Sequence, residues 1–94
     1  MADLSLTHSL AIPEDVVFRV LDDEAVVLNL KSGVYFGLDP VGTRVWQLLA
    51  EHRSLERVLG VLVAEYDVDR ATLERDLLEL GRRMQAKGLV TVVE

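Results

Sequence analysis

The chain has 94 residues, of which 50% are hydrophobic and 28% are charged, with no cysteine and a formal net charge of −6. This length predicts a single domain over residues 1–94, and the missing cysteines exclude disulfides, thiolate metal sites and a cysteine nucleophile. An acidic chain without a basic stripe is a poor partner for nucleic acid, because that affinity depends on cations that neutralise phosphates. We see neither a signal peptide nor the roughly 20 apolar residues of a membrane span, so we expect a cytoplasmic protein without a membrane partner.

The first part of the chain shows strand patterns. Residues 1–13 alternate loosely, which is compatible with a short strand or with a loosely ordered arm on the domain. Residues 16–21, VVFRVL, predict a first strand, and a polar turn follows it. Residues 25–30 and 34–38 then predict a hairpin around Gly33, because glycine adopts the positive φ that such a turn requires. Short connections between these strands favour a three-stranded antiparallel meander.

At Asp39 the apolar period changes from that of a strand to that of a helix. Asp39 is suited to cap backbone N–H groups, and Pro40 to the first helical position, where its missing N–H costs nothing. We expect three helices, one over Pro40–Glu51, one capped by Ser54 and reaching Tyr66, and one over about Arg70–Lys87 with Gly88 just beyond it. Residues 89–93 predict a short terminal strand or an extended tail. The fold class is therefore α+β, a winged helix-turn-helix-like arrangement in which a three-stranded antiparallel sheet precedes three helices.

Two helical side chains give specific packing expectations. Trp46 directly follows the last strand of the meander and stands beside Val45, so we expect it to be buried on the inner face of the first helix, against the sheet. Leu78 lies about 140° around the third helix from Leu73, away from the apolar stripe. It is either an ordinary surface leucine or a point of contact with a partner protein.

The chemistry that catalysis requires is missing from the sequence. The two histidines, His8 and His52, are expected to be structural or solvated. No metal-ligand spacing and no glycine-rich phosphate loop are present. We therefore expect no enzyme, no catalytic residue, no cofactor and no metal, and no hydrolysis by the chain alone.

One stretch, LNLKSGVYFGLDPVGTRVWQLL, resembles the PqqD-like family of RiPP recognition elements. The resemblance depends on the hairpin turn, the strand residues 35–38, the helix start at 39–42 and the pair Val45-Trp46, and it extends roughly from Val16 to the C-terminus. It is closest to the stand-alone leader-peptide-binding proteins of lasso-peptide biosynthesis. The resemblance implies a non-catalytic module that captures the leader segment of a ribosomally made precursor peptide. The module would present the leader to a separate processing enzyme, a leader peptidase or another tailoring enzyme.

In that family the leader lies in a groove between the third strand and the third helix and extends the sheet. Carried over to this chain, the resemblance implies a leader-binding site made of Val34, Tyr35, Phe36, Gly37 and Leu38 on one wall and Leu73, Asp76, Leu77, Leu80 and Arg83 on the other. Strand alternation leaves open whether Tyr35 or the set that includes Phe36 faces the core. Gly37 has two interpretations, since it could let another backbone approach or make room for Trp46 or the third helix.

The alternative function is that of a small winged-helix DNA-binding regulator, with a recognition helix that begins at Asp69. Recognition helices present bases and amides to the groove at their N-terminal end. Here that end carries the acidic residues Asp69, Glu74, Asp76 and Glu79. Because carboxylates repel phosphates, the sequence favours the peptide-binding function.

Overall fold

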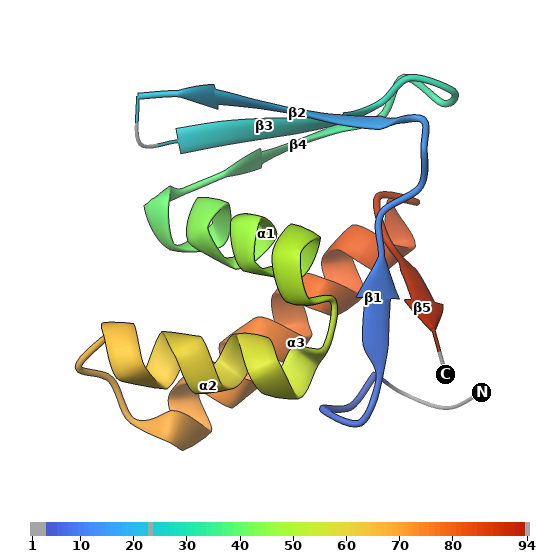
Figure 1. Ribbon diagram of the computed structural model, residues 1–94. Coiled ribbons are helices and arrows are strands. Elements are labelled where there is room, and N and C mark those ends of the chain that lie inside the picture. The colour runs from blue at the N-terminus through green and yellow to red at the C-terminus, as the bar shows by residue number, and fades with distance from the viewer. Residues whose placement is uncertain (1–3, 23, 94) are drawn as a thin grey trace.

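In the computed structural model, which describes residues 4–22 and 24–93, a three-stranded antiparallel sheet lies over a layer of three helices (Figure 1). The elements in chain order are β1 (Ser9–Ala11), β2 (Val16–Leu21), β3 (Glu24–Asn29), β4 (Tyr35–Leu38), α1 (Pro40–His52), α2 (Leu55–Glu65), α3 (Arg70–Ala86) and β5 (Thr91–Val93). The larger sheet has the strand order β2-β3-β4, and β1 pairs with β5 in a separate two-stranded sheet. The α+β class is confirmed, and the predicted elements are present with ends that shift by one or two residues. None of these helices is long and apolar enough to cross a membrane.

The β3–β4 turn is tied to the end of α3 by one side chain. Gly33 adopts the expected positive φ, at 76°. Asn29 accepts hydrogen bonds at its Oδ1 from the backbone N–H groups of Lys31 and Ser32, at 2.9 and 3.2 Å. Its Nδ2 donates to the carbonyl oxygen of Gly88, at 3.0 Å. The start of β4 is therefore held near the C-terminal end of α3.

Each helix begins directly after the N-cap residue that the sequence predicts. The side chains of Asp39, Ser54 and Asp69 each accept a hydrogen bond from the backbone N–H three residues further on, at 2.7, 3.3 and 3.3 Å. Such caps satisfy N–H groups that have no partner inside the helix. The direction in which α1 leaves β4 is thus set at Asp39.

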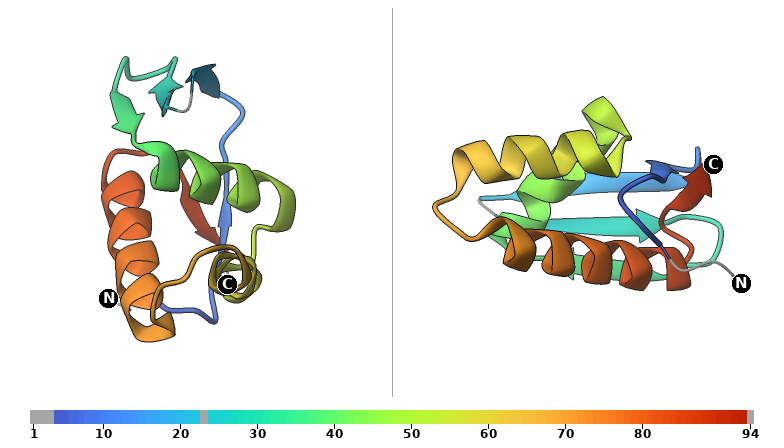
Figure 2. Two further views of the ribbon diagram at one scale, coloured as in Figure 1. Left: turned by 90° about the vertical axis from the view of Figure 1, so that its left-hand side faces the viewer. Right: turned by 90° about the horizontal axis from the view of Figure 1, so that it is seen from below.

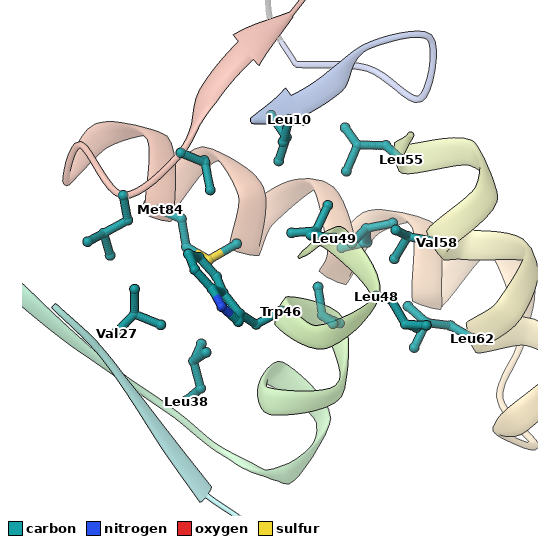
Figure 3. Packing of buried hydrophobic residues seen from close by; sticks show 14 of the residues in the cluster. Leu10, Val27, Leu38, Trp46, Leu48, Leu49, Leu55, Val58, Leu62 and Met84 are labelled. Atoms are coloured by element: carbon teal, nitrogen blue, oxygen red, sulfur yellow. The ribbon is translucent and has the colours of Figure 1, made fainter. Parts of the chain in front are cut away.

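Trp46 joins the sheet to the helices, and its predicted burial on the inner face of α1 is confirmed. Its exposed fraction is 3%, and its ring stacks on Phe18 of β2 with 5.9 Å between the ring centroids. Figure 3 shows Trp46 among Val27 and Leu38 from the sheet and Met84 from α3. The indole thus fills the space in which three elements meet.

The two ends of the chain pair with each other, which resolves the alternatives left open for both. Leu10 in β1 is fully buried, and its N–H donates to the carbonyl oxygen of Arg53 at 2.9 Å. In register, Leu10 lies opposite Val92 of β5. Met1–Asp3 of the expected arm and Asp23 of the expected turn lie outside the described residues.

The N-terminal segment also packs on α3. Leu4 is buried, and a Cβ atom added to Gly81 would lie 2.7 Å from Leu4 Cδ2, so this glycine lets the segment approach the helix closely. Leu78 is half-buried and packs against the hydrophobic core. Leu78 therefore has a packing role, which neither of the two interpretations from the sequence included.

An ion pair between α1 and α2 supplies a pH-dependent contribution to stability. Arg44 donates from Nε and Nη2 to the two carboxylate oxygens of Glu65, at 2.9 and 2.6 Å. These hydrogen bonds, helped by the positive charge and opposed by desolvation, lower the pKa of Glu65. The pKa of Glu65 is lower in the folded state than in the unfolded state. The ion pair therefore stabilises the fold fully at pH values above the pKa of Glu65 in the unfolded state, and this stabilisation is lost as the pH falls through its pKa in the folded state.

We expect Arg44→Gln to raise the pKa of Glu65 towards its ordinary value, as measured by NMR titration of the carboxyl carbon. The matched control is Arg57→Gln, on the exposed side of α2. It should leave the pKa of Glu65 unchanged. An unchanged pKa in Arg44→Gln would contradict the ion pair.

Candidate functional site

A groove of about 510 Å³ opens between β4 and α3. Both views of Figure 2 place these two elements on the same side of the molecule. Eight of the ten residues of the implied site line the groove: Phe36, Gly37, Leu38, Leu73, Asp76, Leu77, Leu80 and Arg83. The fold therefore brings together residues from two walls that are more than thirty positions apart in the sequence.

The two faces of β4 differ sharply in burial, which resolves the open question of its orientation. Phe36 and Leu38 are 9% and 3% exposed, whereas Tyr35 is 71% exposed. Tyr35 therefore lies on the outer face of the sheet, and its side chain does not line the groove. Val34 is half-buried and also lies outside the lining.

Gly37 is not a packing glycine. A Cβ atom built on it would meet no heavy atom within 4 Å, so neither Trp46 nor α3 occupies that space. Because it alternates with the inward-facing Phe36 and Leu38, its missing side chain would point to the outer face. The backbone is exposed at this point of the strand.

β4 is an edge strand, and its alternating backbone groups are available to a further strand. Within the described residues the larger sheet ends at β4. The N–H of Asn29 donates to the carbonyl oxygen of Val34, at 2.8 Å, which marks a hydrogen-bonded pair. Antiparallel pairing alternates, so in the observed register Phe36 bonds to β3, while the N–H and C=O groups of Tyr35 and Gly37 point to the open edge.

Six further residues complete the groove and were not identified from the sequence: Asp39, Val41, Gly42, Val45, Leu62 and Glu79. Those from the start of α1 directly follow β4 in the chain, so their position after the edge strand was a usable signal. Glu79 lies three residues after Asp76 and four before Arg83, and helical spacing puts all three on one side of α3. Leu62 comes from α2, and no local pattern links it to β4.

Two cations lie over the aromatic ring at one end of the groove. The Arg83 guanidinium carbon is 5.2 Å from the centroid of the Phe36 ring, and the Lys87 Nζ atom is 5.9 Å from it. These distances are within the range of cation–π attraction. The Phe36 ring thus attracts two positively charged side chains to this end of the groove.

The histidines make local contacts away from the groove. His8 Nδ1 accepts a hydrogen bond from the N–H of Ser5 at 3.1 Å, and His52 Nε2 lies 3.9 Å from a carboxylate oxygen of Glu51. Among residues 4–22 and 24–93, no group of three or more His, Asp or Glu side chains is placed to hold a metal ion. The groove and its strand edge therefore form the candidate functional site.

Comparisons with known proteins identify the family and the fold of the chain. A family described as "Coenzyme PQQ synthesis protein D (PqqD)" matches residues 24–90. The solved structure "TbiB1 in Complex with the TbiA(beta) Leader Peptide" is 47% identical, with a TM-score of 0.79 over 84% of this chain and 92% of that chain. "Lasso peptide synthetase B1 complexed with the leader peptide" is 25% identical, with a TM-score of 0.78 over 88% and 98%. No curated protein matches the chain.

Proposed function

Because the chain belongs to the PqqD family, as a PqqD-like RiPP recognition element, we propose that it captures the leader segment of a ribosomally made precursor peptide. The observation that supports this most directly is the edge of β4, which no other strand of the described residues covers, beside an apolar groove. An extended peptide that adds to such an edge gains main-chain hydrogen bonds from the strand and selectivity from side-chain pockets. The two similar solved structures, each described as a complex with a leader peptide, have this fold.

The strand edge and the groove have separate tasks in this proposal. The outward N–H and C=O groups of Tyr35 and Gly37 hold the leader backbone, largely irrespective of its sequence. Apolar side chains of the leader enter the groove between Phe36 and Leu80. Because a strand alternates, every second leader residue faces this groove.

The chain itself performs no chemistry in this proposal. It presents the leader to a separate processing enzyme, which for a lasso-peptide system is the leader peptidase. The leader arises on ribosomes, so capture takes place in the cytoplasm. Docking of the leader as a strand keeps the rest of the precursor outside the groove and accessible to that enzyme.

Titration of the fluorescein-labelled TbiA(beta) leader peptide tests the proposal. Leu80, a half-buried lining residue, is expected to act as an anchor contact. Leu80→Ala should weaken binding by about 1–3 kcal/mol, as for a typical buried anchor. The matched control is Val63→Ala on α2, which removes a partly exposed apolar side chain outside the lining. It should bind as the wild type does, and fluorescence anisotropy measures both.

Two further arms of the experiment separate the alternatives. Labelled duplex DNA is expected not to bind, and precursor incubated with the purified chain is expected to remain uncut. If folded Leu80→Ala binds the peptide as tightly as wild type, the leader does not use this groove. Tight, strongly salt-dependent DNA binding would instead favour the winged-helix regulator.

A further inference from the structure

The groove has opposite charges at its two ends. One end is the Phe36 ring with the Arg83 and Lys87 cations over it. Lys31, in the turn that precedes β4, belongs to the same end of the sheet. A peptide segment bound at this end would lie near two or three positively charged side chains.

The other end is acidic and is formed where β4 runs into α1. Asp39 and Asp76 line the groove there, and Glu79 lines its middle, between Asp76 and Arg83 on α3. Asp76 Oδ1 lies 3.6 Å from Arg75 Nε, but with exposed fractions of 61% and 70% this pair is weak, and Arg75 does not line the groove. Asp76 therefore keeps its negative charge towards an occupant.

A second hollow extends the acidic end beyond the strand. It shares Gly37, Leu38 and Asp39 with the groove and adds Asp22, just after β2, and Glu24, the first residue of β3. The same short stretch of β4 thus borders carboxylates on both sides. The carboxylates of the second hollow therefore add to the negative charge that the groove's own lining residues place at the Asp39 end.

The distance between the two charged ends of the groove equals the length of a short extended peptide segment. β4 and α3 run in opposite directions (Figure 1), because the turn before β4 is bonded through Asn29 to Gly88, just beyond the C-terminal end of α3, and β4 runs from there towards the start of α1. Asp76 and Arg83 are seven residues apart on α3, roughly 10 Å at 1.5 Å per residue, and Lys87 lies roughly 6 Å further. An extended strand covers 10–16 Å in about three to five residues.

We propose that the docked leader segment is itself polarised, with a cationic residue at the Gly37–Asp39 end and an anionic residue about three to five positions away, at the Phe36 end. Apolar residues lie between them. This rests on the proposed function and adds that charge determines the register and direction of the leader. Because like charges repel and opposite charges attract across the docked interface, a like charge in either place is disfavoured and an opposite charge is favoured.

A charge scan of the labelled TbiA(beta) leader peptide tests this inference. In one series each position is replaced singly by lysine, and in the other by glutamate. The ratio of the two dissociation constants, Kd(Glu)/Kd(Lys), is then measured at every position by fluorescence anisotropy. We expect a ratio of about 2–5 over the acidic end and of about one-half to one-fifth over the basic end, as for exposed ion pairs. Raising the salt to 0.5 M should bring both ratios towards one.

Variants of the protein assign each end. Asp76→Asn should bring the ratio at the acidic end towards one, and Arg83→Gln should do so at the basic end. The matched controls are Glu14→Gln, in the loop before β2 at the far edge of the sheet, and Arg57→Gln, at the start of α2. They should change neither ratio, and circular dichroism confirms that each variant is folded.

The outcomes separate this inference from the proposed function. Tight binding of the unmodified peptide with a ratio near one at every position, or with ratios that Asp76→Asn and Arg83→Gln leave unchanged, overturns the polarised groove alone. If no peptide of either series binds, the leader-capture function is overturned and the polarity with it. A ratio above one and a ratio below one at positions three to five residues apart support both, and their order along the peptide gives the direction of the leader.

Discussion

Trp46→Ala is expected to lower the free energy of unfolding by about 3–5 kcal/mol, the usual cost of removing a large buried aromatic side chain. The ring is 3% exposed and stacks on Phe18, so its loss leaves a cavity where α1, α3 and the sheet meet. A domain of this size has a total stability of about 5–15 kcal/mol, so the variant should be close to unfolding at ambient temperature. Urea denaturation followed by circular dichroism measures the change.

The neighbouring residue supplies the control. Gln47 is on the same helix and exposed, so Gln47→Ala should leave the unfolding midpoint nearly unchanged. Should Trp46→Ala melt within a degree or two of the wild type, the sheet and the helices would not depend on this contact. The arrangement of β4 relative to α3, and with it the groove, would then need another explanation.

Proline at the outward-facing positions of β4 is expected to weaken leader binding strongly while the fold survives. Tyr35→Pro and Gly37→Pro each remove an N–H that points to the open edge, and proline is tolerated on edge strands. The leader loses one hydrogen bond, and its own carbonyl is left buried without a partner. Together these losses are worth about 2–4 kcal/mol, roughly 30- to 1,000-fold in affinity. Phe36→Pro instead breaks the β3–β4 ladder, so that variant is expected to unfold.

Alanine at the same positions separates the backbone effect from the side-chain effect. Tyr35→Ala and Gly37→Ala keep the outward N–H, and the added Cβ of Gly37→Ala meets no atom within 4 Å in the protein. Both should therefore bind the labelled leader nearly as well as the wild type, with circular dichroism reporting the fold. Proline variants that are folded and bind normally would show that the leader does not pair with β4. Loss of binding in Gly37→Ala alone would mean that the leader approaches the backbone more closely than an added strand does.

Local signals in the sequence determined the elements and their ends. Gly33 at the hairpin turn and the caps Asp39 and Ser54 act within a few residues of chain, so their effect is visible without the fold. The burial of Trp46 was also predictable, because a helical period directly after a strand leaves one inner face for a large aromatic residue. The resemblance to PqqD-like domains added the identity of the two groove walls, which no local pattern contains.

Only the tertiary structure decided which groups meet across long stretches of chain. Strand alternation allows either face of β4 to be buried, and contact with α1 and α3 selected the face with Phe36 and left Tyr35 outside. The pairing of β1 with β5 joins residues eighty or more positions apart, which two short apolar segments do not specify on their own. Asp39 is the N-cap of α1 and Asp76 lies on α3, and both line the groove because β4 and α3 run in opposite directions. The charge pattern of the groove is therefore a property of the packed chain, since Coulomb interactions depend on distances in space and the sequence states only distances along the chain.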